Sequence, residues 1–159
     1  MWWNDPNLAA GAAPELPPLT RDRIEEFLKR EEYRYFIDSD GDIGGHWTDF
    51  TVYFLLATDD KDVLYLTGRW AERLPLEQRA AALEACNKFQ VEHFWPKLNV
   101  VDRDNYLDVH AEAVTNLGAG VTDEQLSILL DTGLSAMSQA FEMLADTLLA
   151  RNPEAPAAN

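Results

Sequence analysis

The chain has 159 residues and a formal net charge of −15, from 13 basic and 28 acidic side chains. This length fits one domain with a complete hydrophobic core. The charge argues against binding to a nucleic-acid backbone or an anionic membrane, both of which depend on Lys and Arg. No window approaches the roughly 20 apolar residues of a membrane span, and the first residues lack a signal-peptide pattern. We therefore expect a cytoplasmic protein that binds neither nucleic acid nor membrane.

The two ends of the chain have the composition of tails. Residues 1–18 are rich in Ala, Gly and Pro, which predicts a flexible N-terminal tail, and residues 151–159 predict a disordered C-terminal tail. Trp2 and Trp3 are unusual in a linker, because two indole rings are costly to leave in water. We expect them to bind a groove on this domain or on a neighbouring subunit. Residues 19–150 form the single predicted domain.

The first half of this domain predicts one helix followed by strands. Thr20 fits the N-cap of a helix over about 21–31, and a strand follows over 33–38. After a polar, glycine-rich loop, residues 47–57 are rich in β-branched and aromatic side chains, which predicts a strand covered on both faces. The next strand covers residues 63–70.

The second half predicts a helix over 76–94, a hairpin with strands over 98–102 and 106–116, and a final helix over 123–150 that begins at a Thr122 capping box. Side chains at helical spacing along the first of these helices are expected to face the core: Leu76, Leu83, Cys86 or Asn87, Gln90 and Phe94.

The order α-β-β-β-α-β-β-α groups the strands by short turns, which predicts an α+β fold with a twisted antiparallel sheet and packed helices. The final helix would be about 42 Å long, whereas five strands span only about 24 Å. Part of its apolar stripe would overhang the sheet unless the helix bends at Gly133. An overhanging apolar stripe favours a homodimer.

The segment 38–42 resembles the start of a calcium-binding loop, because its carboxylates alternate. The pattern then fails, since Ile43 replaces the required glycine and Asp49 replaces the usual final glutamate. A hairpin loop with solvated carboxylates is the favoured interpretation. The alternative is a sensor of metal ions or small ligands built on the acidic loop 38–46, with His46 or His110.

A second possible metal site is one strand face, where His110 and Glu112 could share an ion with a third ligand. Exposed strand positions are the simpler interpretation. Cys86 lies in an alanine-rich helical segment, which indicates a buried, unreactive thiol. No nucleophile elbow, phosphate-binding loop or dinucleotide fingerprint is present in the sequence. We therefore expect no catalytic residue, no bound metal and no cofactor.

Three segments resemble the YbjN-like family of bacterial proteins, which are regarded as sensory transduction regulators. They are DSDGDIGGHW at 38–47, GRW at 68–70, and the helix end from Cys86-Asn87 to Phe94-Trp95-Pro96-Lys97. The resemblance covers residues 20–148 and is strongest to actinobacterial members. It implies these signature positions: Asp40, Asp42, Gly44, Gly45, Trp47, Gly68, Trp70, Asn87, Trp95 and Pro96.

The resemblance also implies a fold similar to type III secretion chaperones, usually dimeric, and no established reaction. It predicts a non-enzymatic regulatory or adaptor protein, in sensory transduction or the stress response, that binds a protein partner of unknown identity through its sheet and helix surfaces. Turn geometry and core packing explain most signature positions. Asn87 is the exception, because an amide within a helix needs hydrogen-bond partners, and we expect it to hold loop 40–46.

Overall fold

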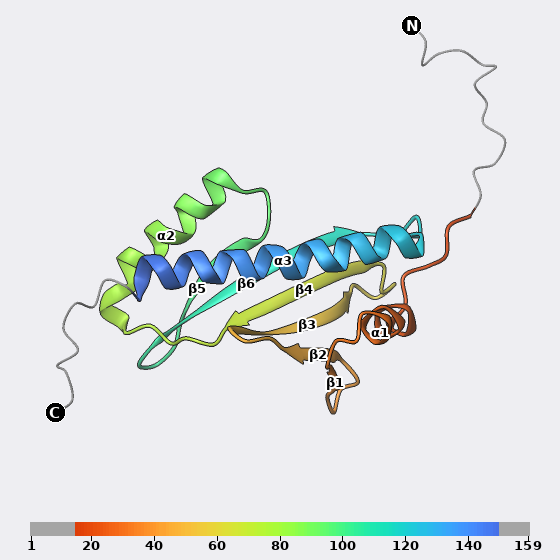
Figure 1. Cartoon of the computed structure of the whole chain (residues 1–159), viewed down its shortest axis with the longest axis horizontal. Coiled ribbons are helices and arrows are strands. Elements are labelled where there is room, and N and C mark those ends of the chain that lie inside the picture. The colour runs from red at the N-terminus through yellow and green to blue at the C-terminus, as the bar shows by residue number, and fades with distance from the viewer. Residues whose placement is uncertain (1–14, 150–159) are drawn as a thin grey trace, which may run out of the picture.

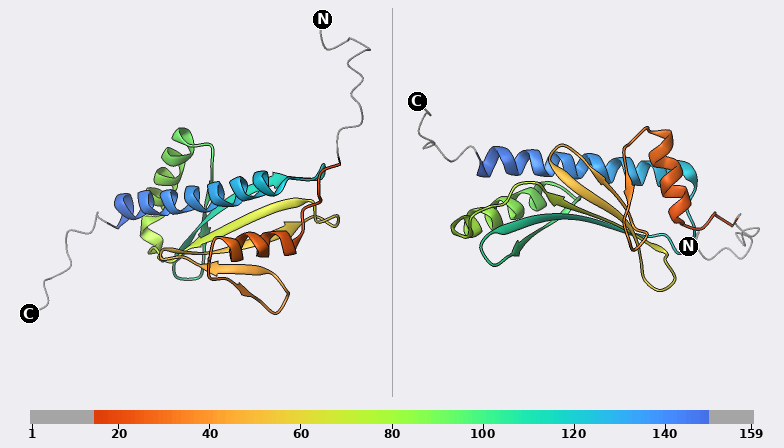
Figure 2. Two further views of the ribbon diagram at one scale, coloured as in Figure 1. Left: turned by 45° about the vertical axis from the view of Figure 1, so that its right-hand side comes forward. Right: turned by 90° about the horizontal axis from the view of Figure 1, so that it is seen from below.

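The computed structural model describes residues 15–149, so the proposed groove for Trp2 and Trp3 concerns residues outside the described part. One antiparallel six-stranded sheet carries the helices on a single face (Figures 1 and 2). The elements are α1 (Arg21–Arg30), β1 (Phe36–Ile37), β2 (Ile43–His46), β3 (Phe50–Ala57), β4 (Val63–Trp70), the 3-10 turn η3 (Leu76–Gln78), α2 (Arg79–Glu92), β5 (Lys97–Asp102), β6 (Leu107–Asn116) and α3 (Asp123–Leu148). The expected α+β class is confirmed.

The strands lie in the order β1-β2-β3-β4-β6-β5, and every neighbouring pair is antiparallel. The sixth strand is β2, which the sequence placed in a loop. A turn separates it from β3, closed by a 2.8 Å hydrogen bond from Trp47 N to Phe50 O. The prediction of one uninterrupted strand over 47–57 is therefore wrong.

Aromatic rings explain how the glycine pair of β2 joins the sheet. A Cβ on Gly44 would lie 2.5 Å from the Phe36 ring, and a Cβ on Gly45 would lie 2.5 Å from the Trp47 ring. The rings thus occupy the space that side chains would take, and they supply the packing that glycine lacks in a strand. Trp47 also stacks on Phe50 with ring centroids 5.8 Å apart.

Two glycines let α3 lie close against β4. A Cβ on Gly68 of β4 would lie 2.9 Å from Met137 Sδ, and a Cβ on Gly133 of α3 would lie 2.7 Å from Leu66 Cδ2. Beside this contact, Trp70 stacks on Phe141 of α3, with ring centroids 6.2 Å apart and planes inclined by 6°. The core therefore lies between α3 and the centre of the sheet.

The apolar stripe of α3 is covered by the chain itself. Its buried side chains run from Leu126 near the first turn to Leu148 at the end, and α3 contacts the sheet, α1 and α2. The expected overhang is absent because α2 lies against α3 as well as against β5. This removes the α3 stripe as an argument for a homodimer.

The face of the sheet opposite the helices is open. On β3, Val52 and Phe54 are buried under the helices, whereas Tyr53 and Leu55 are half-buried on the other face. The expectation that both faces of this strand are covered is therefore wrong, because α1, α2 and α3 all lie on one side (Figure 2). We call this uncovered surface the open face and define it by Thr51, Tyr53, Thr67, Arg69 and His110, which the strand registers place side by side.

Both predicted helix caps are present. The Thr20 hydroxyl accepts a hydrogen bond from Arg23 N, and Thr122 and Gln125 form a complete capping box. Residues 15–18, which the sequence assigned to the tail, lie beside these caps, where Pro17 O accepts a 2.9 Å hydrogen bond from Val121 N. Within the described residues, no helix is long and apolar enough to cross a membrane.

Candidate interaction surface

The first group of signature positions lies in the β1–β2 hairpin. Asp38 Oδ1 accepts hydrogen bonds from the backbone N–H groups of Asp40 and Asp42, at 2.9 and 3.0 Å. Asp42 itself accepts a 2.7 Å hydrogen bond from Arg21 Nη2. The loop carboxylates therefore close the hairpin and attach it to α1.

The remaining signature positions lie elsewhere. Gly68 and Trp70 are buried beneath α3, whereas Asn87, Trp95 and Pro96 lie in α2 and the segment that follows it. Because β1–β2 and β5 form opposite edges of the sheet, and α2 lies against β5, the three groups do not converge on one site.

Asn87 shows this separation most directly. Its side chain is exposed on α2 and lies at the far side of the sheet from loop 40–46. The hypothesis that Asn87 holds this loop is therefore wrong. Asn87 lies on the solvent-facing side of α2, together with Leu83 and Gln90 of the predicted core stripe.

Neither proposed metal arrangement is assembled. Among residues 15–149, no three His, Cys, Asp or Glu side chains are grouped as metal ligands. Glu112 accepts a hydrogen bond from Tyr65 at 2.8 Å and pairs with Lys97 Nζ at 2.5 Å. Burial lowers the pKa of His110, although the nearby Asp108 carboxylate opposes this effect. Glu112 is thus engaged by Tyr65 and Lys97, and no ligand set among the described residues joins it to His110.

Cys86 is buried on the inner side of α2, as the sequence indicated. Burial raises the pKa of its thiol to about 11. Since the thiolate is the nucleophilic form, this thiol is suited to packing and not to nucleophilic attack at neutral pH.

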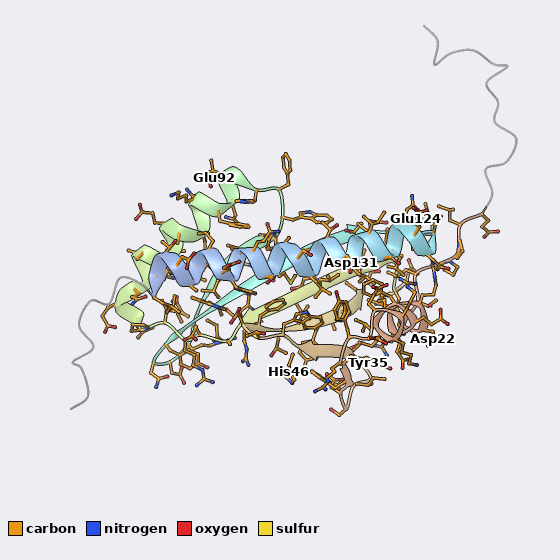
Figure 3. The ribbon with its side chains drawn as sticks, viewed as in Figure 1. Asp22, Tyr35, His46, Glu92, Glu124 and Asp131 are labelled. Carbon is orange, nitrogen blue, oxygen red and sulfur yellow. The ribbon has the colours of Figure 1, made fainter. Side chains whose placement is uncertain are left out.

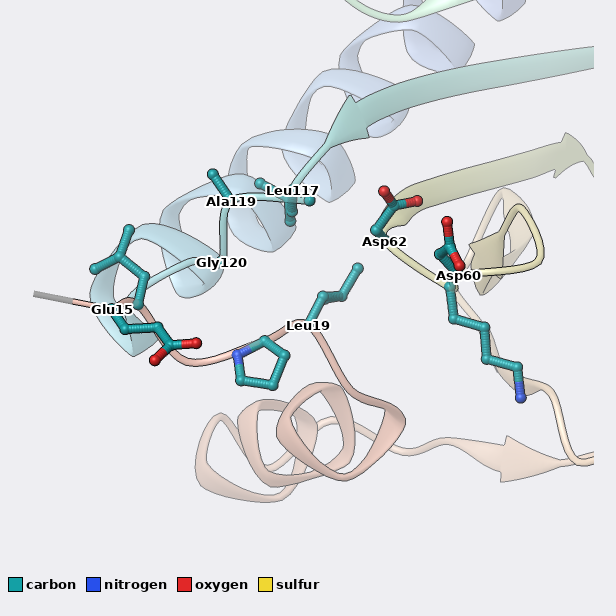
Figure 4. A pocket seen from close by; sticks show the side chains of 11 residues that line it. Glu15, Leu19, Asp60, Asp62, Leu117, Ala119 and Gly120 are labelled. Carbon is teal, nitrogen blue, oxygen red and sulfur yellow. The ribbon is translucent and has the colours of Figure 1, made fainter. Parts of the chain in front are cut away.

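One hollow lies between three loops, at the end of the sheet where α3 begins (Figure 4). Its volume is about 440 Å³, and Glu15, Asp60 and Asp62 contribute its carboxylates. Asp62 is already engaged, because Oδ1 accepts a 2.6 Å hydrogen bond from Thr58. Among the described residues its lining has no histidine, cysteine or serine, so it lacks a Ser–His or Cys–His pair.

The most distinctive surface is the outer side of α2. Its exposed apolar side chains, with those of the turn before it and the bend after it, form what we call the α2 face: Leu76, Leu83, Val91 and Phe94. Val91 is 79% exposed and Phe94 is fully exposed. In Figures 1 and 3 the helix runs outward at an angle to α3, and Glu92 marks its outer end.

Of the predicted core stripe of α2, Cys86 is buried, whereas Leu76, Leu83, Gln90 and Phe94 are exposed. The buried side chains are Ala82, Ala85, Cys86 and Phe89, which follow the same helical spacing. Small alanine side chains allow α2 to lie close to α3 and β5, and the larger Leu76, Leu83 and Phe94 are left in solvent. The helical spacing of the alanines could have predicted the buried side of α2, but the larger apolar side chains favoured the other side.

Comparison with known proteins is consistent with this architecture. A sequence profile described as "YbjN: Putative bacterial sensory transduction regulator" matches residues 20–146. The chain belongs to the YbjN family. The stronger likeness to actinobacterial members stays a prediction. No curated protein matches the sequence significantly.

Solved structures are similar to this chain at low sequence identity. The E. coli YbjN structure, described as "a putative transcription regulator", has a TM-score of 0.67 at 11% identity and covers 80% of this chain and 92% of its own. An uncharacterized protein from Methanothermobacter thermautotrophicus has a TM-score of 0.51 at 13% identity, covering 80% and 98%. A chain from a chaperone–effector complex has a TM-score of 0.48 at 14% identity, covering 79% and 99%. At these identities the likeness concerns the fold alone.

Proposed function

We propose that this YbjN-family protein is a non-enzymatic cytoplasmic regulator, in sensory transduction or the stress response, that acts by binding another protein through the α2 face. The observation that carries the proposal is the exposure of Leu83 and Val91 on α2 and of Phe94 in the bend that follows it. Family membership supports a regulatory role.

The spacing on the α2 face is suited to a partner groove or helix. Leu83 and Val91 are about two helical turns apart on α2, and Phe94 lies in the bend two residues after the helix ends. Single exposed apolar residues are ordinary, but a row of them marks an interaction surface. Full burial of a Val, Leu or Phe side chain contributes about 1.5–3 kcal/mol. Burial of these side chains would supply part of the binding energy, less for Leu83, which is only 46% exposed in the free chain.

A second copy of the chain is the first partner that we propose for this face. In a two-fold dimer the same patch serves both protomers, so the α2 face would pack on itself. The net charge of −15 on each copy opposes this association through mutual repulsion. Added salt screens such repulsion, and the dimer should therefore strengthen as ionic strength rises.

The test is Phe94→Asp, because a fully exposed side chain can change without disturbing the core. Sedimentation measures self-association of wild type and variant, and affinity capture from the native cell with each as bait identifies partners. Ile128→Asp is the matched control, since Ile128 is an exposed apolar residue on α3.

We expect Phe94→Asp to melt at the wild-type temperature, to sediment as a monomer and to lose partners that Ile128→Asp retains. A wild type that stays monomeric at high concentration and high salt would exclude the homodimer. Identical partners on the wild-type and Phe94→Asp baits would exclude the α2 face as the binding surface.

A further inference from the structure

The open face of the sheet contains a polar groove of about 400 Å³. Seven side chains line it: His46, Thr51, Tyr53, Thr67, Arg69, Arg103 and His110. Strand register builds it, because His46 pairs with Thr51, Thr51 with Arg69, and Arg69 with His110. One row of polar side chains therefore crosses four neighbouring strands.

The charge of this groove differs from that of the whole protein. The chain has 28 acidic and 13 basic side chains, yet none of the seven lining residues is acidic, and two are arginines. Two carboxylates on β6 are paired with basic side chains, and one of these pairs uses the charge of Arg103, which leaves Arg69 as the unpaired arginine of the described groove. Asp108 Oδ2 accepts a 2.8 Å hydrogen bond from Arg103 Nε, and Glu112 is paired with Lys97.

Several polar groups in the groove have unused hydrogen-bonding capacity. Within residues 15–149, the exposed Arg69 guanidinium makes no ion pair or side-chain hydrogen bond. The His110 Nε2 atom is enclosed without a hydrogen-bond partner, and its nearest carboxylate oxygen, Asp108 Oδ2, is 3.9 Å away. Thr51 Oγ1 already contacts His46 Nδ1 at 3.0 Å, so these two side chains are held in place beside Arg69. An unpaired guanidinium beside positioned hydroxyl and imidazole groups matches the oxygens of a phosphate.

The volume and the aromatic lining indicate that the ligand is larger than phosphate. Small-molecule sites typically occupy about 300–1,000 Å³, and the groove falls within this range. Tyr53 supplies an aromatic surface, held edge-on against Phe36 with ring centroids 5.7 Å apart. An organic group next to the phosphate would therefore have a rigid apolar contact.

We propose that the groove binds a small phosphate monoester, with Arg69 and Thr51 holding the phosphate and Tyr53 contacting the organic group. The site lies on the face of the sheet opposite the helices and shares no residue with the α2 face. It adds a small-ligand site to the proposed protein-binding role and does not depend on that role.

Isothermal titration calorimetry of the full chain at low salt tests the site with three probes: inorganic phosphate, ribose 5-phosphate and adenosine 5′-monophosphate. Ribose and adenosine are the matched probes without phosphate. We expect saturable binding of one molecule per chain for at least one phosphate ester, weaker binding of inorganic phosphate, and none of ribose or adenosine. The ester that binds more tightly shows whether the organic group of the ligand resembles a sugar or a nucleoside.

Two variants locate the binding. Arg69→Gln should weaken binding of the phosphate ester by about tenfold to a hundredfold, because it removes a hydrogen-bonded charge. Thr51→Val keeps the side-chain shape and removes only the hydroxyl, so it should weaken binding by about fivefold. Arg34→Gln is the control, since Arg34 is exposed and lies outside the groove. Circular dichroism melting verifies that each variant is folded.

The proposal is overturned if no ester binds at millimolar concentration, if adenosine binds as tightly as its phosphate, or if Arg69→Gln binds like wild type. The proposal would also be overturned if a phosphoserine peptide binds and none of the three small probes does, because the groove would then bind a phosphorylated protein.

Discussion

The close contact between β4 and α3 gives a sharp test of how Gly68 stabilises the fold. A Cβ at this position would lie 2.9 Å from Met137 Sδ and 3.5 Å from both Phe141 Cε2 and Phe50 Cδ2. Non-bonded atoms of this size prefer about 3.5–4.0 Å. Met137 and Phe141 are completely buried, so neither side chain can move into solvent to make room.

The expected cost follows from two opposing contributions. Overpacking a well-packed core costs about 1–3 kcal/mol, whereas replacing glycine by alanine at a compatible backbone gains about 0.4–1 kcal/mol through the unfolded state. Gly68→Ala should therefore lower the free energy of unfolding by about 1 kcal/mol. Gly68→Val adds two more carbons against the same neighbours and should lower it by about 3 kcal/mol.

Equilibrium urea unfolding, followed by tryptophan fluorescence, measures both variants. The same Gly68→Ala change in a Met137→Ala background isolates the contact, because the shortened side chain leaves space for the new methyl group. Met137→Ala alone should cost about 2–5 kcal/mol, and adding Gly68→Ala should then cost nothing or restore stability. Equal costs of Gly68→Ala in both backgrounds, or a loss below about 0.5 kcal/mol for Gly68→Val, would refute the close-contact explanation.

Two further predictions concern Cys86 and the start of α3. Because burial raises the pKa of Cys86 to about 11, its thiol should react with a disulfide reagent at pH 8 only slowly in the folded protein and rapidly in guanidinium; fast labelling of the folded chain would contradict its buried position. Thr122→Ala removes the hydroxyl that accepts from Gln125 N at 3.0 Å and should cost about 1 kcal/mol of unfolding free energy. Thr122→Ser keeps the hydroxyl and should retain most of the unfolding free energy. An equal loss in both variants would show that the cap hydroxyl does not cause the loss.

The two proposed surfaces lie on different sides of the molecule. The α2 face belongs to a helix at the β5 edge, whereas the phosphate groove crosses β2, β3, β4 and β6 on the open face. Variants at Phe94 and Arg69 therefore test protein binding and ligand binding separately. If a ligand changes partner binding, the change must pass through the sheet and the helices packed on it.

Local pattern predicted most elements of the fold. The capping groups Thr20 and Thr122 predicted the starts of α1 and α3, and alternating apolar residues predicted β6. These features depend on neighbours within a few residues, so the sequence alone contains the information. The antiparallel α+β class followed from short connections between strands, which leave no room for parallel crossovers.

Tertiary contacts decided the rest. Gly44 and Gly45 form a strand because Phe36, Tyr53 and Trp47 cover them, and no local propensity describes rings that arrive from other segments. The signature positions are separated because strand order places β1–β2 and β5 at opposite edges.

The clearest case is α2, whose sequence offers two stripes with the same periodicity. Apolar content favoured Leu76, Leu83 and Phe94, whereas the side that contacts α3 and β5 buries Ala82, Ala85, Cys86 and Phe89. The sequence by itself determined that α2 is a helix with apolar residues. The neighbouring elements determined which stripe is buried, because the contacts of α2 with α3 and β5 set which side of the helix faces inward.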